Sequence, residues 1–95
     1  MPQIIYTDRS QKDLHRFYQF LSKKDKSVAI RAIQTIRAAI KETQKMPDGY
    51  RPVPDLPNHR EVIIDFGASG YVARFRYEKG GDIYIVRIKH QLEDE

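Results

Sequence analysis

The sequence contains no cysteine. Disulfide bonds and zinc sites built on thiolates are therefore excluded, and the absence suits a reducing cytosol. No apolar run reaches the roughly 18 residues that a membrane-spanning helix needs, and the first residues lack the apolar core of a signal peptide. We expect a soluble, cytoplasmic protein that has no contact with the membrane.

Motifs for catalysis or cofactor binding are also scarce. The glycines lie where turns are expected, so the sequence has no glycine-rich phosphate loop. His15, His59 and His90 are far apart and lack the spacing of metal ligands, and no serine lies in a nucleophile motif. We therefore expect neither a metal nor a cofactor.

What the sequence does contain is an excess of positive charge. Seventeen Lys and Arg residues against thirteen Asp and Glu give a formal net charge of +4. Such a balance favours an acidic partner, either nucleic acid or an acidic protein segment, if the positive charge gathers on one face. Because 95 residues provide only one modest hydrophobic core, we expect a single domain over residues 1–95.

Hydrophobic spacing in the first half predicts one short strand followed by two helices. Residues 3–6 are mostly apolar and indicate a strand. Apolar residues then recur at helical spacing over about residues 8–22, and again from Ser27 to about Lys45. Only the short polar stretch 23–26 separates these segments, so the helices should pack as an antiparallel hairpin.

The second half predicts strands after an irregular connection. Four of the five prolines fall within residues 47–57, which excludes a helix or a central strand there. Apolar residues then alternate with a period of two in three strands, at 62–66, 71–77 and 83–89, with turn residues between them. The order β-α-α-β-β-β predicts an α+β fold in which a helical hairpin packs on a small antiparallel sheet.

The alternation of side chains predicts a sheet with two unlike faces. The row expected to cover the helices comprises Tyr71, Ala73, Phe75, Tyr77, Tyr84, Val86 and Ile88. The row expected on the opposite face comprises Val72, Arg74, Arg76, Ile83, Ile85, Arg87 and Lys89. Glu61 and Asp65 should share that second face and partly neutralise it. Arginine interleaved with apolar residues is common at interfaces, although arginines that merely keep the face soluble are the alternative.

His90 ends the last strand, beside Lys89 and Arg87. A neutral imidazole in that place could act as a general acid or base at neutral pH. The alternative is a structural histidine that closes the sheet.

This layout resembles the RelE/ParE superfamily, the toxins of type II toxin–antitoxin systems. The local sequence is most similar to the ParE or plasmid-stabilisation branch, and the similarity covers nearly the whole chain. The segments that carry it are Val53-Pro54 with Leu56, Arg60-Glu61, Phe66-Gly67, Gly70-Tyr71-Val72, Arg74-Phe75-Arg76-Tyr77, and Val86-Arg87 leading into His90-Gln91. The resemblance implies a toxin whose cognate antitoxin, encoded by an adjacent gene, wraps and silences it.

The resemblance also implies one of two activities. ParE-type toxins inhibit DNA gyrase, whereas RelE-type toxins cut mRNA on the ribosome by promoting attack of a ribose 2′-hydroxyl on the adjacent phosphate. In a nuclease, His90, Arg74 and Arg87 would be catalytic. In either case the residues expected to bind the target or the antitoxin are Arg60, Arg74, Arg76, Arg87 and Lys89.

Two differences from the nuclease pattern favour gyrase inhibition. Gln91 stands where those enzymes commonly have a C-terminal tyrosine, and Tyr71 lies near the position where many have an arginine. Ribosome-dependent mRNA cleavage is the alternative activity. A non-toxic member, serving as a binding module or co-repressor with its antitoxin, is the third possibility.

Overall fold

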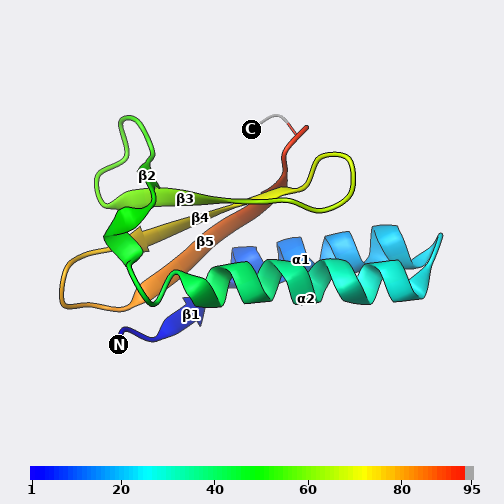
Figure 1. The fold of residues 1–95 in the computed structure, drawn as a ribbon, viewed down its shortest axis with the longest axis horizontal. Helices are drawn as coiled ribbons and strands as arrows, with labels where there is room; N and C mark the ends of the chain where they lie inside the picture. The colour runs from blue at the N-terminus through cyan, green and yellow to red at the C-terminus, as the bar shows by residue number, and fades with distance from the viewer. Residues whose placement is uncertain (94–95) are drawn as a thin grey trace.

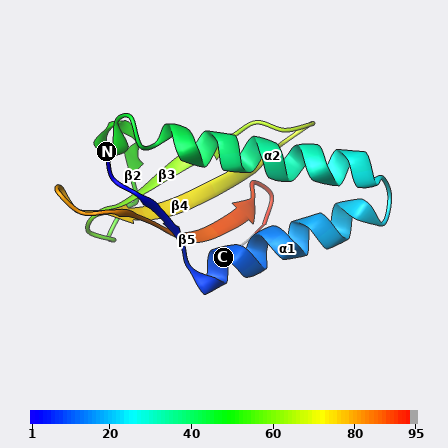
Figure 2. The same cartoon turned by 90° about the horizontal axis from the view of Figure 1, so that it is seen from below.

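Two helices lie side by side along one face of a five-stranded sheet, and no helix of residues 1–93, the part that the computed structural model describes, covers the other face (Figures 1 and 2). The helices are α1 (Asp8–Ser22) and α2 (Lys26–Glu42). The strands are β1 (Ile4–Tyr6), β2 (Arg51–Pro52), β3 (His59–Ile64), β4 (Tyr71–Tyr77) and β5 (Ile83–His90). The predicted α+β fold is confirmed.

The sheet is wider than the three antiparallel strands that the sequence indicates. Its order is β1-β5-β4-β3-β2, in which β1 pairs parallel with β5 and every other pair is antiparallel. β2 is only two residues long, and Pro52 is tolerated there because an edge strand can spare one N–H donor. Two residues are too few to show a period of two, so the sequence pattern could not reveal this strand.

The helices begin at side chains that satisfy their first backbone N–H groups. The hydroxyl of Thr7 accepts a hydrogen bond from the N–H of Ser10 at 3.2 Å, and α1 ends at Ser22 as predicted. A carboxylate oxygen of Asp25 accepts from the N–H of Ser27 at 2.9 Å and starts α2. The Ser27 hydroxyl, which donates to the same carboxylate at 2.7 Å, and the backbone N–H groups of Val28 and Ser27 hold the pKa of Asp25 below its ordinary value.

α2 ends at Glu42, earlier than the predicted end near Lys45. The N–H groups of residues 43–45 bond three residues back rather than four, so the chain tightens out of the α-helix. The short 3₁₀ helix η1 (Pro47–Gly49) then leads into the proline-rich connection. None of the helices in the described part of the chain is long and apolar enough to cross a lipid bilayer.

The core lies between the helices and the face of the sheet that they cover, which we call the inner face. The fully buried apolar residues are Ala29, Ala32, Ile36, Ile40, Ala73, Phe75, Ile83, Ile85 and Ile88. Those on α2 recur at helical spacing and those on β4 alternate, as the patterns predict. Phe75 lies at the centre of the sheet, and its ring meets that of Tyr50 edge-on at a centroid distance of 5.8 Å.

A β-bulge in β5 changes which of its residues face the core. Arg74 pairs with Arg87, but Phe75 pairs with Ile85, so Val86 is an extra residue with no partner on β4. A bulge inserts one residue and thereby reverses the alternation on either side of it.

The predicted orientation of the first half of β5 is consequently wrong. Ile83 and Ile85 were expected on the exposed face, and both are fully buried. Tyr84 was expected to face the helices, and it lies instead opposite Arg76 on the other face, while Val86 is only partly buried. Beyond the bulge the prediction is correct, because Ile88 is buried.

The edge of β5 beyond β1 is completed by a helix side chain rather than a strand. A carboxylate oxygen of Asp13, on α1, accepts a hydrogen bond from the N–H of Ile88 at 2.8 Å. The second carboxylate oxygen contacts Arg9 at 3.4 Å and Arg16 at 3.5 Å. The buried carboxylate therefore takes the place of a strand neighbour, because β1 pairs with β5 only as far as Ile85.

Candidate functional site

Four residues form a single row across four neighbouring strands on the face of the sheet that the helices leave uncovered, which we call the outer face. The pairing register places Arg51 opposite Glu61, Glu61 opposite Arg74, and Arg74 opposite Arg87. Cross-strand partners lie on the same face with their Cβ atoms about 5 Å apart. We call these four residues the outer row, and its charges run plus, minus, plus, plus from β2 to β5.

Glu61 is the centre of a hydrogen-bonded network in the outer row. Its Oε2 accepts from Nε of Arg74 at 3.2 Å and from Nη2 of the same guanidinium at 3.0 Å. Its Oε1 accepts from Nη2 of Arg51 at 3.2 Å. The side chain of Glu61 is 13% exposed and that of Arg74 is 20% exposed, so this pair is partly shielded from water. The prediction that Glu61 shares the face of the arginines is confirmed.

The outer row is extended by the other two predicted cations of the outer face. Lys89 lies opposite Val72 and, with Glu61, Arg74 and Arg87, packs around the buried Val72 side chain. Arg76 stacks its guanidinium on the ring of Tyr84 at 5.1 Å and pairs with Glu78 at 3.1 Å. Arginines over an apolar floor can bind carboxylates or phosphates, and their donors carry no group that exchanges a proton near neutral pH.

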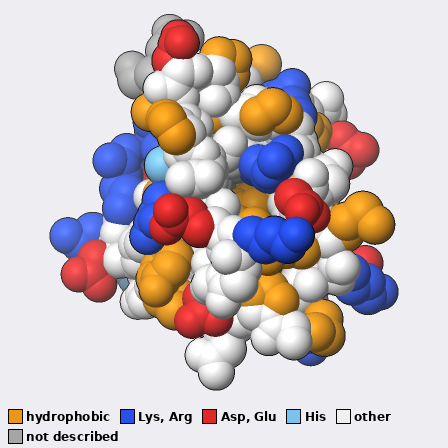
Figure 3. Space-filling model, turned by 90° about the vertical axis from the view of Figure 1, so that its left-hand side faces the viewer, with side chains coloured by type: hydrophobic (Ala, Val, Ile, Leu, Met, Phe, Trp, Pro, Cys, Tyr) orange, Lys and Arg blue, Asp and Glu red, His pale blue; other side chains and the backbone are white. Residues whose placement is uncertain are grey.

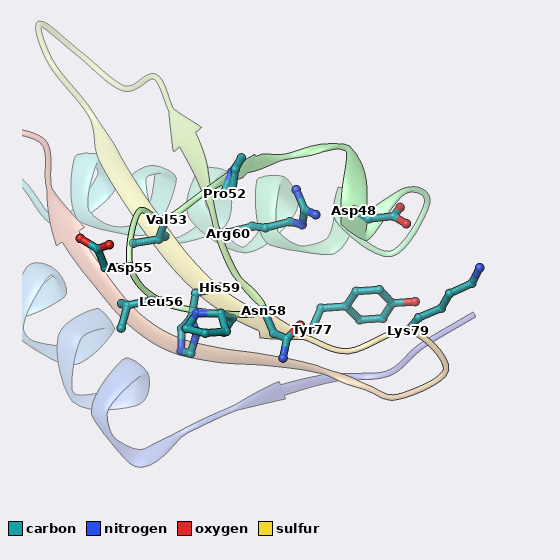
Figure 4. Close-up of a pocket in the computed structure, with 11 residues that line it drawn as sticks. Asp48, Pro52, Val53, Asp55, Leu56, Asn58, His59, Arg60, Tyr77 and Lys79 are labelled. Carbon is teal, nitrogen blue, oxygen red and sulfur yellow. The ribbon is translucent and has the colours of Figure 1, made fainter.

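Arg60, which the sequence grouped with these cations, lies on the inner face. It is paired with the buried Phe75, and its Nη1 donates to the carbonyl oxygen of Tyr50 at 2.6 Å. Figure 4 shows Arg60 reaching from β3 toward the short helix that carries Asp48. The structure therefore does not bring Arg60 together with the outer row.

Arg60 helps to line a hollow of about 580 Å³ beside the proline-rich connection (Figure 4). Its rim mixes acidic Asp48 and Asp55 with basic Lys79, and Nδ1 of His59 is occupied by the carbonyl oxygen of Pro57 at 2.8 Å. Figure 3 looks onto this end of the molecule and shows basic and acidic side chains interleaved. No single charge dominates the hollow.

His90 is separated from Arg74 and Arg87 by the sheet. It is paired with the buried Tyr71 on the inner face, and the two rings meet edge-on at 5.4 Å. Its Nδ1 accepts from the N–H of Leu92 at 3.2 Å, so the ring proton must lie on Nε2, which is 3.0 Å from the hydroxyl of Ser69. Both ring nitrogens of a neutral imidazole are thus used by the chain itself.

The segment after His90 folds back on α1. A carboxylate oxygen of Glu93 accepts from the N–H of His90 at 2.9 Å, and the other lies 3.3 Å from Arg16. Burial alone would raise the pKa of Glu93, but these hydrogen bonds and the positive charges of Arg16 and Arg87 hold it below its ordinary value. Glu93 is thus held against α1, and Asp94 and Glu95 lie outside the described residues.

Tyr71, which stands near the place of a nuclease arginine, is a core residue. Its side chain is 5% exposed, and its ring lies 4.8 Å from that of Phe17. Burial and the nearby charge of Glu93 raise the pKa of the Tyr71 hydroxyl. Within residues 1–93, no group of three or more His, Cys, Asp or Glu side chains is arranged to hold a metal ion.

The comparisons with known proteins agree with this fold. A family model for the ParE toxin of the type II toxin–antitoxin system parDE matches residues 4–95. Toxin RelE1 of Caulobacter vibrioides is 32% identical over 90 residues, which span 95% of this chain and 94% of the relative. Toxin RelE3 of the same organism is 33% identical over 93 residues, which span 98% of each protein.

A solved structure, described as the chromosomal ParDE toxin–antitoxin system from P. aeruginosa, has the same fold. It superimposes with a TM-score of 0.79 at 24% identity, covering 95% of this chain and 96% of the solved one. From the match of nearly the whole chain to the family model and from the two relatives, it follows that this chain belongs to the ParE toxin family, within the RelE/ParE superfamily of type II toxins.

Proposed function

We propose that this toxin inhibits DNA gyrase by direct protein contact through its outer face. Membership of a two-component toxin–antitoxin family implies an antitoxin as its physiological partner. The proposed target works in the cytoplasm, so the proposal also places the toxin there. The observation that carries the choice of target is the separation of His90 from Arg74 and Arg87 by the sheet.

RNA cleavage needs groups that the outer row does not assemble: His59 lies on the outer face, but beside Arg76 rather than in the row, and its Nδ1 is engaged by the carbonyl oxygen of Pro57 at 2.8 Å. A base must take the proton of the 2′-hydroxyl, and an acid must protonate the leaving oxygen, both within hydrogen-bond reach of the same phosphate. His90 is on the inner face with both ring nitrogens engaged, and the two oxygens of Glu61 accept from Arg51 and Arg74. A guanidinium can stabilise a phosphorane, but it stays protonated and cannot serve as the base that takes the proton of the 2′-hydroxyl.

The outer face has the composition of a protein interface. Arginine is enriched in such interfaces and often contributes most of the binding energy, especially beside apolar or aromatic surface. The outer face has such apolar and aromatic surface beside its arginines. Arg76 lies on the ring of Tyr84, and Arg74 and Arg87 lie beside Val72. The alternating charges of the outer row favour a partner with a matching pattern rather than any acidic surface.

Two assays on purified full-length protein separate the candidate targets. In the first, gyrase supercoils a relaxed plasmid in the presence of the toxin, and we expect inhibition that is lost in the double variant Arg74→Gln, Arg87→Gln. In the second, primer extension maps mRNA in a translating extract, and we expect no new 5′ ends.

The second candidate is ribosome-dependent mRNA cleavage, which the RelE names of two relatives and the cationic outer face favour. Translation-dependent cleavage without any effect on supercoiling would replace our proposal with that one. If neither assay responds and expression leaves growth unimpaired, the protein is a non-toxic binding module or co-repressor.

A further inference from the structure

Glu61 interrupts the positive charge of the outer face. It lies between Arg51 and Arg74 in the outer row, and without it the row would carry three cations across four strands. Its side chain is 13% exposed, and its carboxylate accepts three guanidinium hydrogen bonds that hold it in the row. The negative charge is therefore a fixed part of the surface.

Glu61 also occupies the edge of Arg74 that would recognise a phosphate. The Nε and Nη2 atoms of an arginine form the fork that binds phosphate or carboxylate with two parallel hydrogen bonds. In this structure both atoms of Arg74 donate to Oε2 of Glu61. A phosphodiester arriving at the outer row would have to displace a carboxylate and would meet its repulsion.

We infer that Glu61 makes the outer face select a protein partner and exclude nucleic acid. This inference rests on the proposed function in one respect, that the target is a protein surface. A protein can offer Glu61 a donor while offering acceptors to the neighbouring arginines, because its charges differ from residue to residue. The backbone of RNA cannot do so, because every phosphate carries the same negative charge.

The test is the affinity of the full-length protein for a fluorescein-labelled single-stranded RNA, measured by anisotropy over a range of KCl concentrations. Glu61→Gln keeps the shape and an acceptor for Arg74 while removing the charge. We expect it to bind RNA about tenfold more tightly at low salt, with a salt dependence steeper by roughly one phosphate contact.

Glu42→Gln is the matched control. Glu42 is exposed on α2, where its carboxylate lies 3.3 Å from the ammonium of Lys45, and its replacement changes the net charge equally. We expect RNA affinity to change less than about twofold in this variant, because the charge lies on the helical side of the molecule, away from the outer row.

Equal affinities of Glu61→Gln and Glu42→Gln would overturn the inference. Thermal melting shows whether each variant folds, and Glu61→Thr, a strong strand former without charge, gives the same test if the amide variant does not. The result is independent of the target assays: cleavage of mRNA by the wild type would remove the proposed function, whereas the RNA affinities alone decide the role of Glu61.

Discussion

The two faces of the sheet differ in what their side chains contact. Inner-face residues such as Phe75 and Ile85 are fully buried against the helices. Outer-face residues such as Arg74 and Glu61 contact each other, in hydrogen bonds that remain within reach of solvent. The difference teaches that the apolar inner face specifies the fold, whereas the outer face is built of paired charges that a fold of this size does not need for its stability.

Not every residue on the inner face is apolar and buried. Arg60 and His90 have the inner-face orientation, yet neither lies in the apolar core. Each is tied to the chain by hydrogen bonds, Arg60 to the carbonyl of Tyr50 and His90 to Ser69 and Leu92. Neither residue extends the outer row.

The largest effect is expected from Phe75→Ala. The side chain is fully buried, and removing it should lower the free energy of unfolding by about 3–5 kcal/mol, a large part of the stability of a small domain. Urea unfolding followed by circular dichroism measures the loss. Ile63→Ala on the outer side of β3, which is 45% exposed, should cost much less; equal losses would contradict the division between the faces.

The double variant Arg74→Gln, Arg87→Gln should abolish toxicity while leaving the fold intact. Both residues lie on the outer face, and the ion pair of Arg74 with Glu61 is partly exposed, so the stability cost should be about 1 kcal/mol or less. Growth after induction and the thermal melting temperature are the two measurements. The control, Arg31→Gln with Lys41→Gln on α2, removes the same charge from the helical side. If the folded Arg74, Arg87 double variant still kills, the outer face is not the toxic surface.

His90→Ala should reduce gyrase inhibition by less than about threefold, because the imidazole faces away from the outer row and inhibition by protein contact involves no proton transfer. A nuclease that used this histidine as its acid or base would lose on the order of a hundredfold or more. The concentration of toxin that halves supercoiling, compared with the wild type, distinguishes the two. His15→Ala, on the surface of α1, serves as the control for removing a histidine.

The smallest effect is expected from replacing Glu93, which ties the segment after His90 to α1. Its effect on the stability of the fold should depend on pH. Because the pKa of Glu93 is lower in the folded protein than in the unfolded chain, its carboxylate stabilises the fold at neutral pH. That contribution is lost as the pH falls through the folded-state pKa. The melting temperature of the wild type should exceed that of Glu93→Gln slightly at pH 7, and the two temperatures should converge in acid. A difference that grows in acid would contradict the lowered pKa of Glu93.

Local patterns predicted most of the fold. Helical spacing placed α1 to the residue, began α2 one residue late and ended it about three residues late, and alternation placed β3, β4 and β5 within a few residues. Alternation also predicted Arg74 and Arg87 on the outer face correctly. It failed for Ile83 and Ile85, because the bulge at Val86 is a feature of the pairing between two strands and leaves no trace in the period of either.

The candidate site was predictable only in part. The face on which Arg60 lies could have been predicted from the alternation of side chains along a strand. Arg60 is two residues before the buried Val62 and therefore lies on the same face. The network of Glu61 could not, because it depends on which residues of β2 and β4 stand opposite β3. The role of Asp13 at the edge of β5 could not be predicted either, because its partner is the backbone N–H of Ile88, far away in the chain.

The sequence by itself determined which segments are helices and strands, which residues are apolar enough to form the core, and that the chain carries a surplus of arginine and lysine. These properties depend on residues that are close together in the sequence, and hydrophobic periodicity reports the pattern of such residues. Only the tertiary structure decided the register of the strands, the bulge in β5, the outer row with Glu61 at its centre, and the placement of His90 across the sheet from the arginines. Those features join residues that are distant in the chain, and no local pattern encodes which of them stand opposite each other.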